Sequence, residues 1–286
     1  MPANHLTIDV EEYFEQAPPE VAGKCESRLE GQLDKVLQLL DETGNRATFF
    51  FLARLATMYP SYVKRVASSG HRIGCHGNEH VFLNRLPFEE QVASVRTSIR
   101  AVRDSFDGIV ESFRAPFFSI VGSNRRLLDV LAEENVRFDC SVFPGMHPDY
   151  GWPGTPSTPY RVKLSGGREI AEVPVTTSEI LGLRFGVGGG GWLRMLPWAV
   201  TRRILRGQSL QGNPIIIYLH PWELDPEQPR LKLGMRFPWR HYLNLEATES
   251  RFREILTTYR FVPVEEIALD VLPSFALDEL GKTPRR

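Results

Sequence analysis

Residues 214–223 read Pro-Ile-Ile-Ile-Tyr-Leu-His-Pro-Trp-Glu, a short apolar run that ends in a histidine. A run of this length, bounded by proline, is typical of a strand buried on both faces, as in a parallel sheet. His220 is therefore expected at the carboxyl end of a strand. An imidazole there, with Trp222 as an apolar wall, suits a general acid, although a core histidine bonded to a backbone carbonyl is the commoner case.

Similar apolar segments recur along the chain and alternate with amphipathic ones. Strands are expected at 5–10, 47–52, 71–75, 109–114, 136–140, 169–175 and 215–219, and helices at 29–42, 61–69, 88–106, 123–135, 193–206 and 245–259. The alternation predicts βα units in a barrel or an open parallel sheet. A barrel is favoured because its active site lies at the carboxyl ends of the strands. Polar residues fall at those ends: Asp9, His76, Arg114, Asp139 and His220.

The composition is that of an ordinary globular protein, with 286 residues of which 42% are apolar and 24% charged. The 34 basic and 35 acidic residues give a formal net charge of -1, so no bulk field favours nucleic acid or anionic lipid. The cysteines Cys25, Cys75 and Cys140 have no CxxC spacing, which predicts neither a disulfide framework nor a zinc knuckle. With no leader pattern and no membrane-length apolar run, we expect a soluble, cytoplasmic protein.

Two pairs of residues have spacings that suit a metal ion. Asp9 and Glu11 share one face of an extended segment, and burying both acids would be costly unless a cation compensates. The alternative is that Glu11 and Glu12 open a solvated loop. His76 and His80 are four residues apart, so that on one helical turn they can share a metal, or form a solvated surface turn.

Three other segments have two readings each. Arg114 precedes a turn stiffened by Pro116, where it could hold a catalytic carboxylate or form a structural ion pair. Asp139 follows another strand and could be catalytic or cap a turn. The glycine-rich segment 186–191 could be a flexible lid over a groove or a plain mobile loop. Each signal is weak alone, but polar residues at the same ends of successive strands together favour one active site.

In this order, the motifs resemble the polysaccharide deacetylase family, carbohydrate esterase family 4, with its NodB-homology domain. The resemblance runs from about residue 5 to 223 and rests on Asp9-Val-Glu11, Gly70-His-Arg-Ile-Gly-Cys-His76-x3-His80, Arg114-Ala-Pro116, Asp139-Cys-Ser141 and Leu219-His220. Within the family, the chain is most similar to deacetylases encoded with exosortase-type exopolysaccharide clusters. The segments that carry this second likeness are Asp9-Val-Glu-Glu-Tyr-Phe14, the glycine-rich segment, 220–223 and 241–245.

The resemblance implies a distorted (β/α)7 barrel, an α/β fold, as a single domain with a C-terminal helical extension. The NodB-homology domain would span 1–225, and the extension, 226–286, would pack on the barrel. The implied activity is removal of N-acetyl groups from amino sugars of a bacterial exopolysaccharide or its precursor, with one divalent metal, usually zinc and sometimes cobalt or nickel. The expected partners are an N-acetylated polysaccharide or oligosaccharide and, at the inner membrane face, exopolysaccharide assembly machinery, with no nucleic acid.

The same resemblance implies roles for four residues in proton transfer. Asp9 would be the general base, paired with Arg114. His220 would be the general acid that protonates the departing amine, oriented by Asp139. The resemblance thus implies two pairs: the carboxylate of Asp9 with the guanidinium of Arg114, and the carboxylate of Asp139 with the imidazole of His220.

The metal ligands implied by the resemblance are Glu11, His76 and His80. Val10 stands where the family commonly has a second aspartate, so the carboxylate ligand is shifted to Glu11, with Asp9 as the alternative. The remaining expected residues surround the acetyl group. They are Phe117, through its backbone N–H at the oxyanion, and Leu219 and Trp222 at the methyl.

Two other functions stay open at this point. An enzyme of the same fold could hydrolyse a small cyclic amide or ureide, as the allantoinase-like relatives do, some of them without metal. A catalytically inactive carbohydrate-binding protein could keep the pocket, since the Asp9-Val-Glu11 motif is altered. A closed, deep pocket would favour the small substrate, and an open groove past His220 would favour a polymer.

Overall fold

A computed structural model describes residues 3–180, 182–232 and 239–282. Both predicted domain ranges extend beyond this part. Residues 1–2 and 181 of the expected domain 1–225, and 233–238 and 283–286 of the expected extension 226–286, lie outside the described residues.

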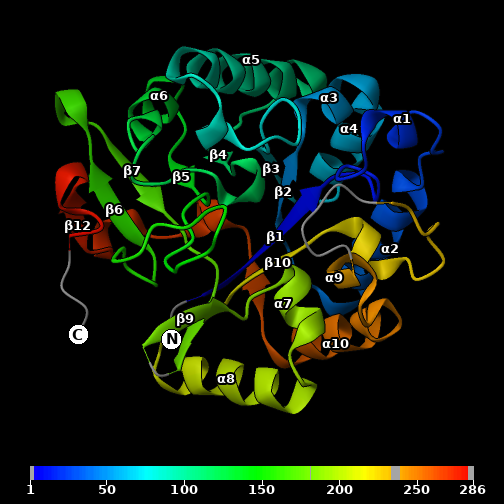
Figure 1. Cartoon of the computed structure of the whole chain (residues 1–286). Coiled ribbons are helices and arrows are strands. Elements are labelled where there is room, and N and C mark those ends of the chain that lie inside the picture. Colours follow the sequence, from blue (N-terminus) through cyan, green and yellow to red (C-terminus); the bar gives the residue numbers. More distant parts are fainter. Residues whose placement is uncertain (1–2, 181, 233–238, 283–286) are drawn as a thin grey trace.

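In the described part, seven parallel strands follow one another across the sheet in the order β10-β1-β2-β3-β4-β5-β7 (Figure 1). In that order they span Ile216–Leu219, Asn4–Val10, Thr48–Phe51, Arg72–Cys75, Ser112–Phe113, Phe138–Asp139 and Glu169–Glu172. The predicted strand positions are correct, although the strands expected at 109–114, 136–140 and 169–175 are shorter than expected. The α/β fold with a parallel sheet is confirmed.

Further strands extend the sheet at its margins. β6 (Tyr160–Lys163) runs antiparallel to β7, and β12 (Ser274–Ala276) pairs with β6. β11 (Phe261–Val262) pairs with β1, while β8 (Thr177–Ile180) and β9 (Leu183–Gly186) form a separate hairpin. The predicted C-terminal extension is therefore only partly helical, because two of its segments join the sheet.

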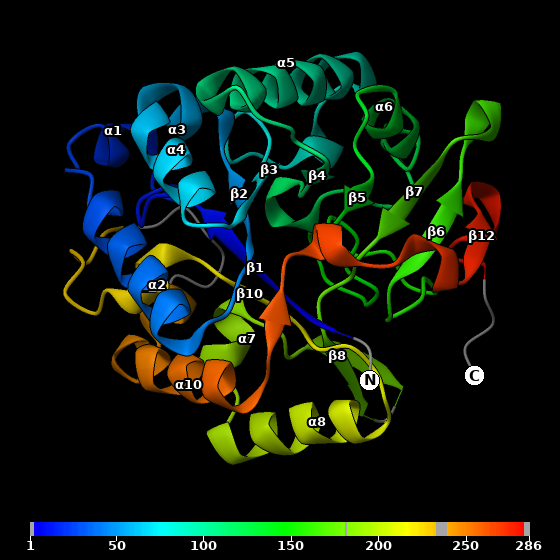
Figure 2. The ribbon, with the colours of Figure 1, turned by 180° about the vertical axis from the view of Figure 1, so that it is seen from behind.

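Helices lie around the outside of the sheet (Figures 1 and 2). They are α1 (Pro19–Ala22), α2 (Leu29–Thr43), α3 (Ala53–Met58), α4 (Pro60–Ser68), α5 (Phe88–Phe106), α6 (Leu127–Glu133), α7 (Gly190–Met195), α8 (Trp198–Leu210), α9 (Trp239–Tyr242) and α10 (Leu245–Thr258). The helix predicted at 193–206 is two helices, because Pro197 cannot continue α7 and begins α8 instead. No helix among the described residues has both the length and the apolar character needed to cross a membrane.

The two ends of the parallel sheet, β7 and β10, meet through a few hydrogen bonds. The amide of Thr176, just past β7, donates to the carbonyl of Ile216 in β10 (3.0 Å), and the amide of Tyr218 donates to the carbonyl of Gly188 (2.7 Å). Gly188 in turn donates to Thr176 (2.9 Å). The glycine-rich segment 186–191 is thus packed against β10 and largely buried, so the expectation of a flexible lid is wrong.

Candidate active site

A cavity of about 890 Å³ lies at the carboxyl ends of the strands. Strand polarity explains this, since parallel strands place the residues that follow them at one edge of the sheet. Most of the site residues predicted from the sequence line it: Asp9, Glu11, His76, His80, Arg114, Phe117, His220 and Trp222.

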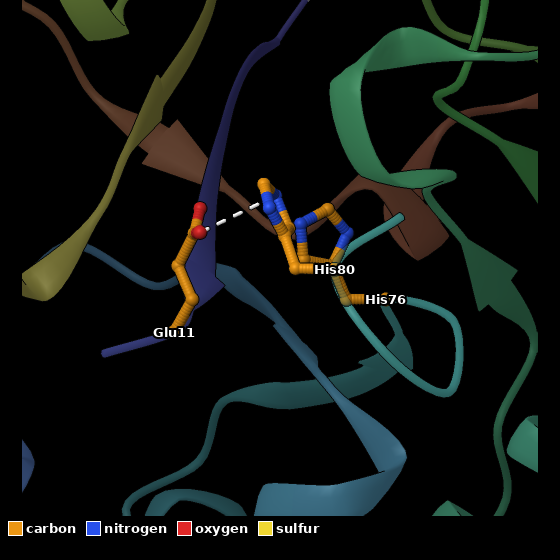
Figure 3. A group of neighbouring side chains, drawn as sticks. All are labelled: Glu11, His76 and His80. Atoms are coloured by element: carbon orange, nitrogen blue, oxygen red, sulfur yellow. Dashed lines mark ion pairs between the residues drawn. The ribbon is translucent and has the colours of Figure 1, made fainter. Parts of the chain in front are cut away.

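Glu11, His76 and His80 form a group that could hold a metal ion (Figure 3). One ligand atom from each residue lies within 4.8 Å of the others. Glu11 follows β1 directly, His76 follows β3, and His80 comes from the next turn of chain, with its Nε2 3.3 Å from Oε2 of Glu11. Two imidazoles and a carboxylate are a donor set that suits zinc and related divalent metals.

The surroundings of the two histidines fit a metal ion. Nδ1 of His76 lies 2.8 Å from the carbonyl oxygen of Arg114, to which it can only donate, so Nε2 keeps its lone pair. Nδ1 of His80 is buried and has no hydrogen-bond partner among the described residues. Burial lowers the pKa of His80 to about 4, so its imidazole is neutral near pH 7 and able to bind a cation.

Glu11 is ionised in the same environment. Burial by itself would raise its pKa, but the adjacent His80 and His220 lower it to about 2. Its side chain is 2% exposed, and its Oε1 lies 2.9 Å from Nε2 of His220. The group therefore combines a buried negative charge with neutral imidazole nitrogen, as a divalent cation requires.

Arg114 and Asp9 form a buried ion pair beside this group. Nη1 of Arg114 lies 2.7 Å from Oδ1 of Asp9 and also donates to Oγ1 of Thr7 (2.8 Å), while Nε donates to the carbonyl of Cys140 (3.2 Å). These bonds fix the plane of the guanidinium and hence of the carboxylate. Oδ2 of Asp9 lies 4.0 Å from Nε2 of His220, on the cavity side.

His220 is held between two carboxylates. Its Nδ1 lies 2.6 Å from Oε1 of Glu223, and its Nε2 faces Glu11. Burial lowers the pKa of His220, but Glu11 and Glu223 together raise it to about 10, so the imidazole carries two protons near neutral pH. Oε2 of Glu223 is paired in turn with Nε of Arg194 at 2.6 Å.

The expected partnership of Asp139 with His220 is wrong. Asp139 accepts a hydrogen bond from Ser141 (2.5 Å), whose Oγ accepts the backbone N–H of Ala115 (2.8 Å). Its direct neighbour is Glu172, its partner in the ladder between β5 and β7. The reason is topological, because β5 and β10 are not adjacent, and the carboxylate that contacts His220 comes from the turn after β10 itself.

Leu219 is not where the resemblance placed it. It is fully buried in the main hydrophobic core and is not among the residues that line the cavity, whereas Tyr218 and His220 on either side of it are. Side chains alternate between the faces of a strand, so Leu219 cannot share the cavity face with its neighbours. It therefore has no place at the acetyl methyl.

Phe117 and Trp222 line the cavity, and each has other rings packed against it. Phe117 lies between His80 (ring centroids 4.2 Å apart) and Phe82 (4.0 Å, 4° between planes). Trp222 lies between His220 (5.1 Å, 18°) and His241 (4.0 Å, 11°). Both side chains therefore brace site histidines.

The backbone at Phe117 is unusual. Phe117 (φ 57°) and Phe118 (φ 52°) both have left-handed backbone conformations, which are costly for bulky residues and concentrate at functional sites. The turn that contains them bonds Phe118 N to the carbonyl of Ala115 (3.1 Å) and Ser119 N to that of Pro116 (3.2 Å). The amide of Phe117 has no such acceptor among the described residues, which suits a group that binds an oxyanion.

Sequence reasoning missed several residues of this site. Glu223 lay inside the quoted motif, three residues after His220, a spacing that places both on one short turn. Arg194 follows the glycine-rich segment and carried no signal of its own, because its partner is distant in sequence. The other missed residues that line the cavity include Phe82, Tyr150, Trp192, Tyr218 and His241.

Comparisons with known proteins divide the chain into two matched segments. Residues 26–138 match the family model described as polysaccharide deacetylase, and residues 140–269 match a domain of unknown function. Chitin deacetylase 2 of Saccharomyces cerevisiae is 27% identical over 114 residues, which are 40% of this chain and 36% of that protein, so the match spans about a third of this relative. The structure of a candidate polysaccharide deacetylase from Mycobacterium smegmatis superposes with a TM-score of 0.61 at 16% identity, covering 100% of this chain and 94% of that one, and shows the same fold.

Proposed function

We propose that this chain, whose residues 26–138 match the polysaccharide deacetylase family model, is a metal-dependent hydrolase that removes N-acetyl groups from amino sugars in a polysaccharide. One observation carries the proposal. Ligand atoms of Glu11, His76 and His80 lie within 4.8 Å of one another, between the Asp9–Arg114 ion pair and His220. Such a site combines a cation-binding group with a base and an acid, which amide hydrolysis requires.

The proposed metal is zinc, with cobalt or nickel as alternatives, held by Glu11, His76 and His80. A divalent metal ion supplies Lewis acidity, which polarises a carbonyl oxygen and makes water more acidic. In this proposal Glu11 is the carboxylate ligand, because Asp9 is already occupied by Arg114 at 2.7 Å.

The remaining chemistry belongs to side chains of this chain. Asp9, oriented by Arg114, accepts a proton from the attacking water through Oδ2, which faces the cavity side of the pair. The free amide of Phe117 donates to the carbonyl oxygen as negative charge develops on it. Nε2 of His220 donates a proton to the nitrogen of the departing amine, as its raised pKa allows near neutral pH.

We propose that the substrate is a segment of a bacterial exopolysaccharide or its precursor. A cavity of about 890 Å³ is at the upper end of the range for small-ligand sites and gives room for more than one sugar ring. The small cyclic amide substrate is less well supported for that reason. Residues 1–225 would form the catalytic domain in this proposal, with 226–286 packed on it.

The test is metal content measured by elemental analysis, together with acetate release from N-acetylated oligosaccharides. We expect about one metal ion per chain in the wild type and loss of that ion in both Glu11→Gln and His80→Ala. The matched control is Asp9→Asn, which should keep the metal but lose acetate release. Metal lost in Asp9→Asn and kept in Glu11→Gln would make Asp9 the ligand, and no metal after reconstitution would refute the hydrolytic proposal.

A further inference from the structure

A chain of buried charges leads away from the proposed acid, His220. Oε1 of Glu223 lies 2.6 Å from Nδ1 of His220 and also accepts the backbone N–H of His220 at 3.1 Å. Oε2 of Glu223 lies 2.6 Å from Nε of Arg194. The side chains of Glu223 and Arg194 are 0% and 3% exposed. The bond between Glu223 and Arg194 is thus shielded from water, which holds these two side chains in one geometry.

We propose that Glu223, anchored by Arg194, is the positioning residue that orients His220 for proton donation to the leaving amine, in place of Asp139. The inference rests on the proposed function. Because Nδ1 of His220 is held 2.6 Å from Oε1 of Glu223, the opposite ring nitrogen, Nε2, is directed toward Glu11 and Asp9 at the cavity. Asp139 cannot take this part, since its neighbours are Ser141 and Glu172.

Arg194 is itself fixed by several backbone groups. Nη1 of Arg194 donates to the carbonyls of Arg240 (2.7 Å) and His241 (2.7 Å). The side-chain amide of Asn244 donates to the backbone carbonyl of Arg194 (2.8 Å). A guanidinium with these acceptors cannot swing away from Glu223 without breaking several bonds. The carboxylate of Glu223 is therefore held from both sides.

The glycine-rich segment explains how Arg194 reaches this place. A Cβ at Gly189 would overlap the carbonyl oxygen of Tyr218, and one at Gly190 would overlap the hydroxyl of the same tyrosine. Only glycine allows α7 to begin so close to β10. One turn later in the same helix, Arg194 meets the residues that follow the end of β10.

The stacked ring of Trp222 supports the same geometry. It lies parallel to His220 and to His241, with the guanidinium carbon of Arg194 5.2 Å from its centroid. The imidazole of His220 is thus constrained at one edge by Glu223 and on one face by Trp222. Rotation about either side-chain bond would lose one of these contacts.

The step that the network serves follows the addition of water to the acetamide carbonyl, in which Asp9 takes the proton of the water. The carbon–nitrogen bond of this adduct then breaks, its electron pair goes to nitrogen, that nitrogen takes the proton from Nε2 of His220, and the acetyl group leaves as acetate with the oxygen of the water. The imidazole ends neutral, with its Nδ1 proton still bound to Glu223. An aryl acetate differs, because its phenolate leaves without a proton, and it should therefore depend much less on His220 and Glu223.

The test compares two substrates in one variant. Glu223→Gln should lower acetate release from an N-acetylglucosamine or N-acetylgalactosamine tetramer, whichever the wild type hydrolyses faster, by about 10²–10³-fold. Hydrolysis of 4-nitrophenyl acetate should fall less than about 5-fold, and Glu223→Asp should recover part of the amide activity. The matched control is Glu265→Gln, which replaces a half-buried carboxylate that accepts hydrogen bonds from Ser112 and Thr48 outside the cavity. It should not alter the ratio of the two rates.

The outcomes separate this inference from the proposed function. Metal content and thermal melting of Glu223→Gln establish that the variant is folded and contains its metal ion. If the wild type is active and Glu223→Gln has the same ratio of amide to ester rates, the positioning role is overturned and the proposed function stands. A wild type that hydrolyses neither tetramer overturns the proposed function and this inference with it.

Discussion

Asp139 and Glu172 are direct partners in the parallel ladder between β5 and β7, and both carboxyl groups are fully buried. Burial raises the pKa of Asp139 to about 6 and raises that of Glu172 well above its usual value, where the adjacent Asp139 adds to the shift. Oδ2 of Asp139 and Oε2 of Glu172 have no other hydrogen-bond partner among the described residues. The pair therefore retains a proton at neutral pH.

This pair makes stability depend on pH. Between the unfolded pKa values of about 4 and the raised folded values, the folded protein binds more protons than the unfolded chain, so the free energy of unfolding falls as pH rises. Glu172→Gln replaces the protonated acid with a neutral isostere. We expect its Tm to exceed that of the wild type by about 2–4 °C at pH 8 and to match it near pH 5.

Differential scanning calorimetry over this pH range checks the prediction. Glu169→Gln is the matched control, because Glu169 lies on the same strand but is exposed and pairs with Arg161. It should shift Tm little at either pH. A Glu172→Gln variant that is destabilised equally at both pH values would contradict a shared proton.

Replacing Gly189 with alanine should destabilise the fold. The new Cβ would overlap the carbonyl oxygen of Tyr218, a backbone atom that cannot move without disturbing β10. We expect a loss of about 1–3 kcal/mol in the free energy of unfolding, measured by urea denaturation. Gly191→Ala is the control, since nothing lies within 4 Å of a Cβ there. Equal losses in the two variants would show that the close approach is not the cause.

The bracing of His80 predicts an effect on metal affinity. Phe82 stacks on Phe117, whose ring contacts His80 at a tilt of 52°, so Phe82→Leu should loosen the imidazole of His80 without removing a direct contact to it. We expect the affinity for zinc to fall about 10-fold, measured by competition with a chelating dye. The control Tyr62→Leu removes a ring that stacks on Tyr59, elsewhere in the fold, and should leave zinc affinity unchanged. Unchanged affinity in Phe82→Leu would remove Phe82 from any supporting role.

Truncation tests the predicted boundary at residue 225. A chain that ends there loses β11, which pairs with β1 in the middle of the sheet, and the buried Phe252 and Phe261. Because this leaves strand groups unpaired and exposes core surface, we expect the shortened chain to be insoluble or to lack cooperative unfolding in circular dichroism. A chain ending at 282 should melt like the full one. Cooperative unfolding of residues 1–225 would show an independent domain.

Much of the site could be predicted because its residues directly follow strands. Asp9 is the second-last residue of β1, and His76 comes directly after β3. An apolar run with a polar end was therefore enough to locate both residues at the carboxyl ends of strands. The pairing of Arg114 with Asp9 was expected from the resemblance and is present at 2.7 Å. In parallel strands, local sequence and shared polarity decide which end a residue occupies.

The sequence could not reveal which side chains meet across the sheet. The resemblance assigned Asp139 to His220, yet the neighbour of Asp139 is set by the register between β5 and β7. Leu219 was assigned to the cavity by its place next to His220, although adjacent residues on a strand face opposite sides. Glu223 and Arg194 are 29 residues apart, and only the packing of α7 against β10 brings them together.

The join between β7 and β10 has a dynamic consequence. The strands from β10 through β1 and β2 to β3 pair over four residues each, whereas Thr176, Gly188 and Tyr218 join β7 to β10 through a few bonds. Thermal opening should therefore begin along this line, and its amides should exchange with deuterium before those of β1 and β2. Tyr218, at this join, and Trp192 both line the cavity, so each such opening would briefly widen the cavity for a polymer chain.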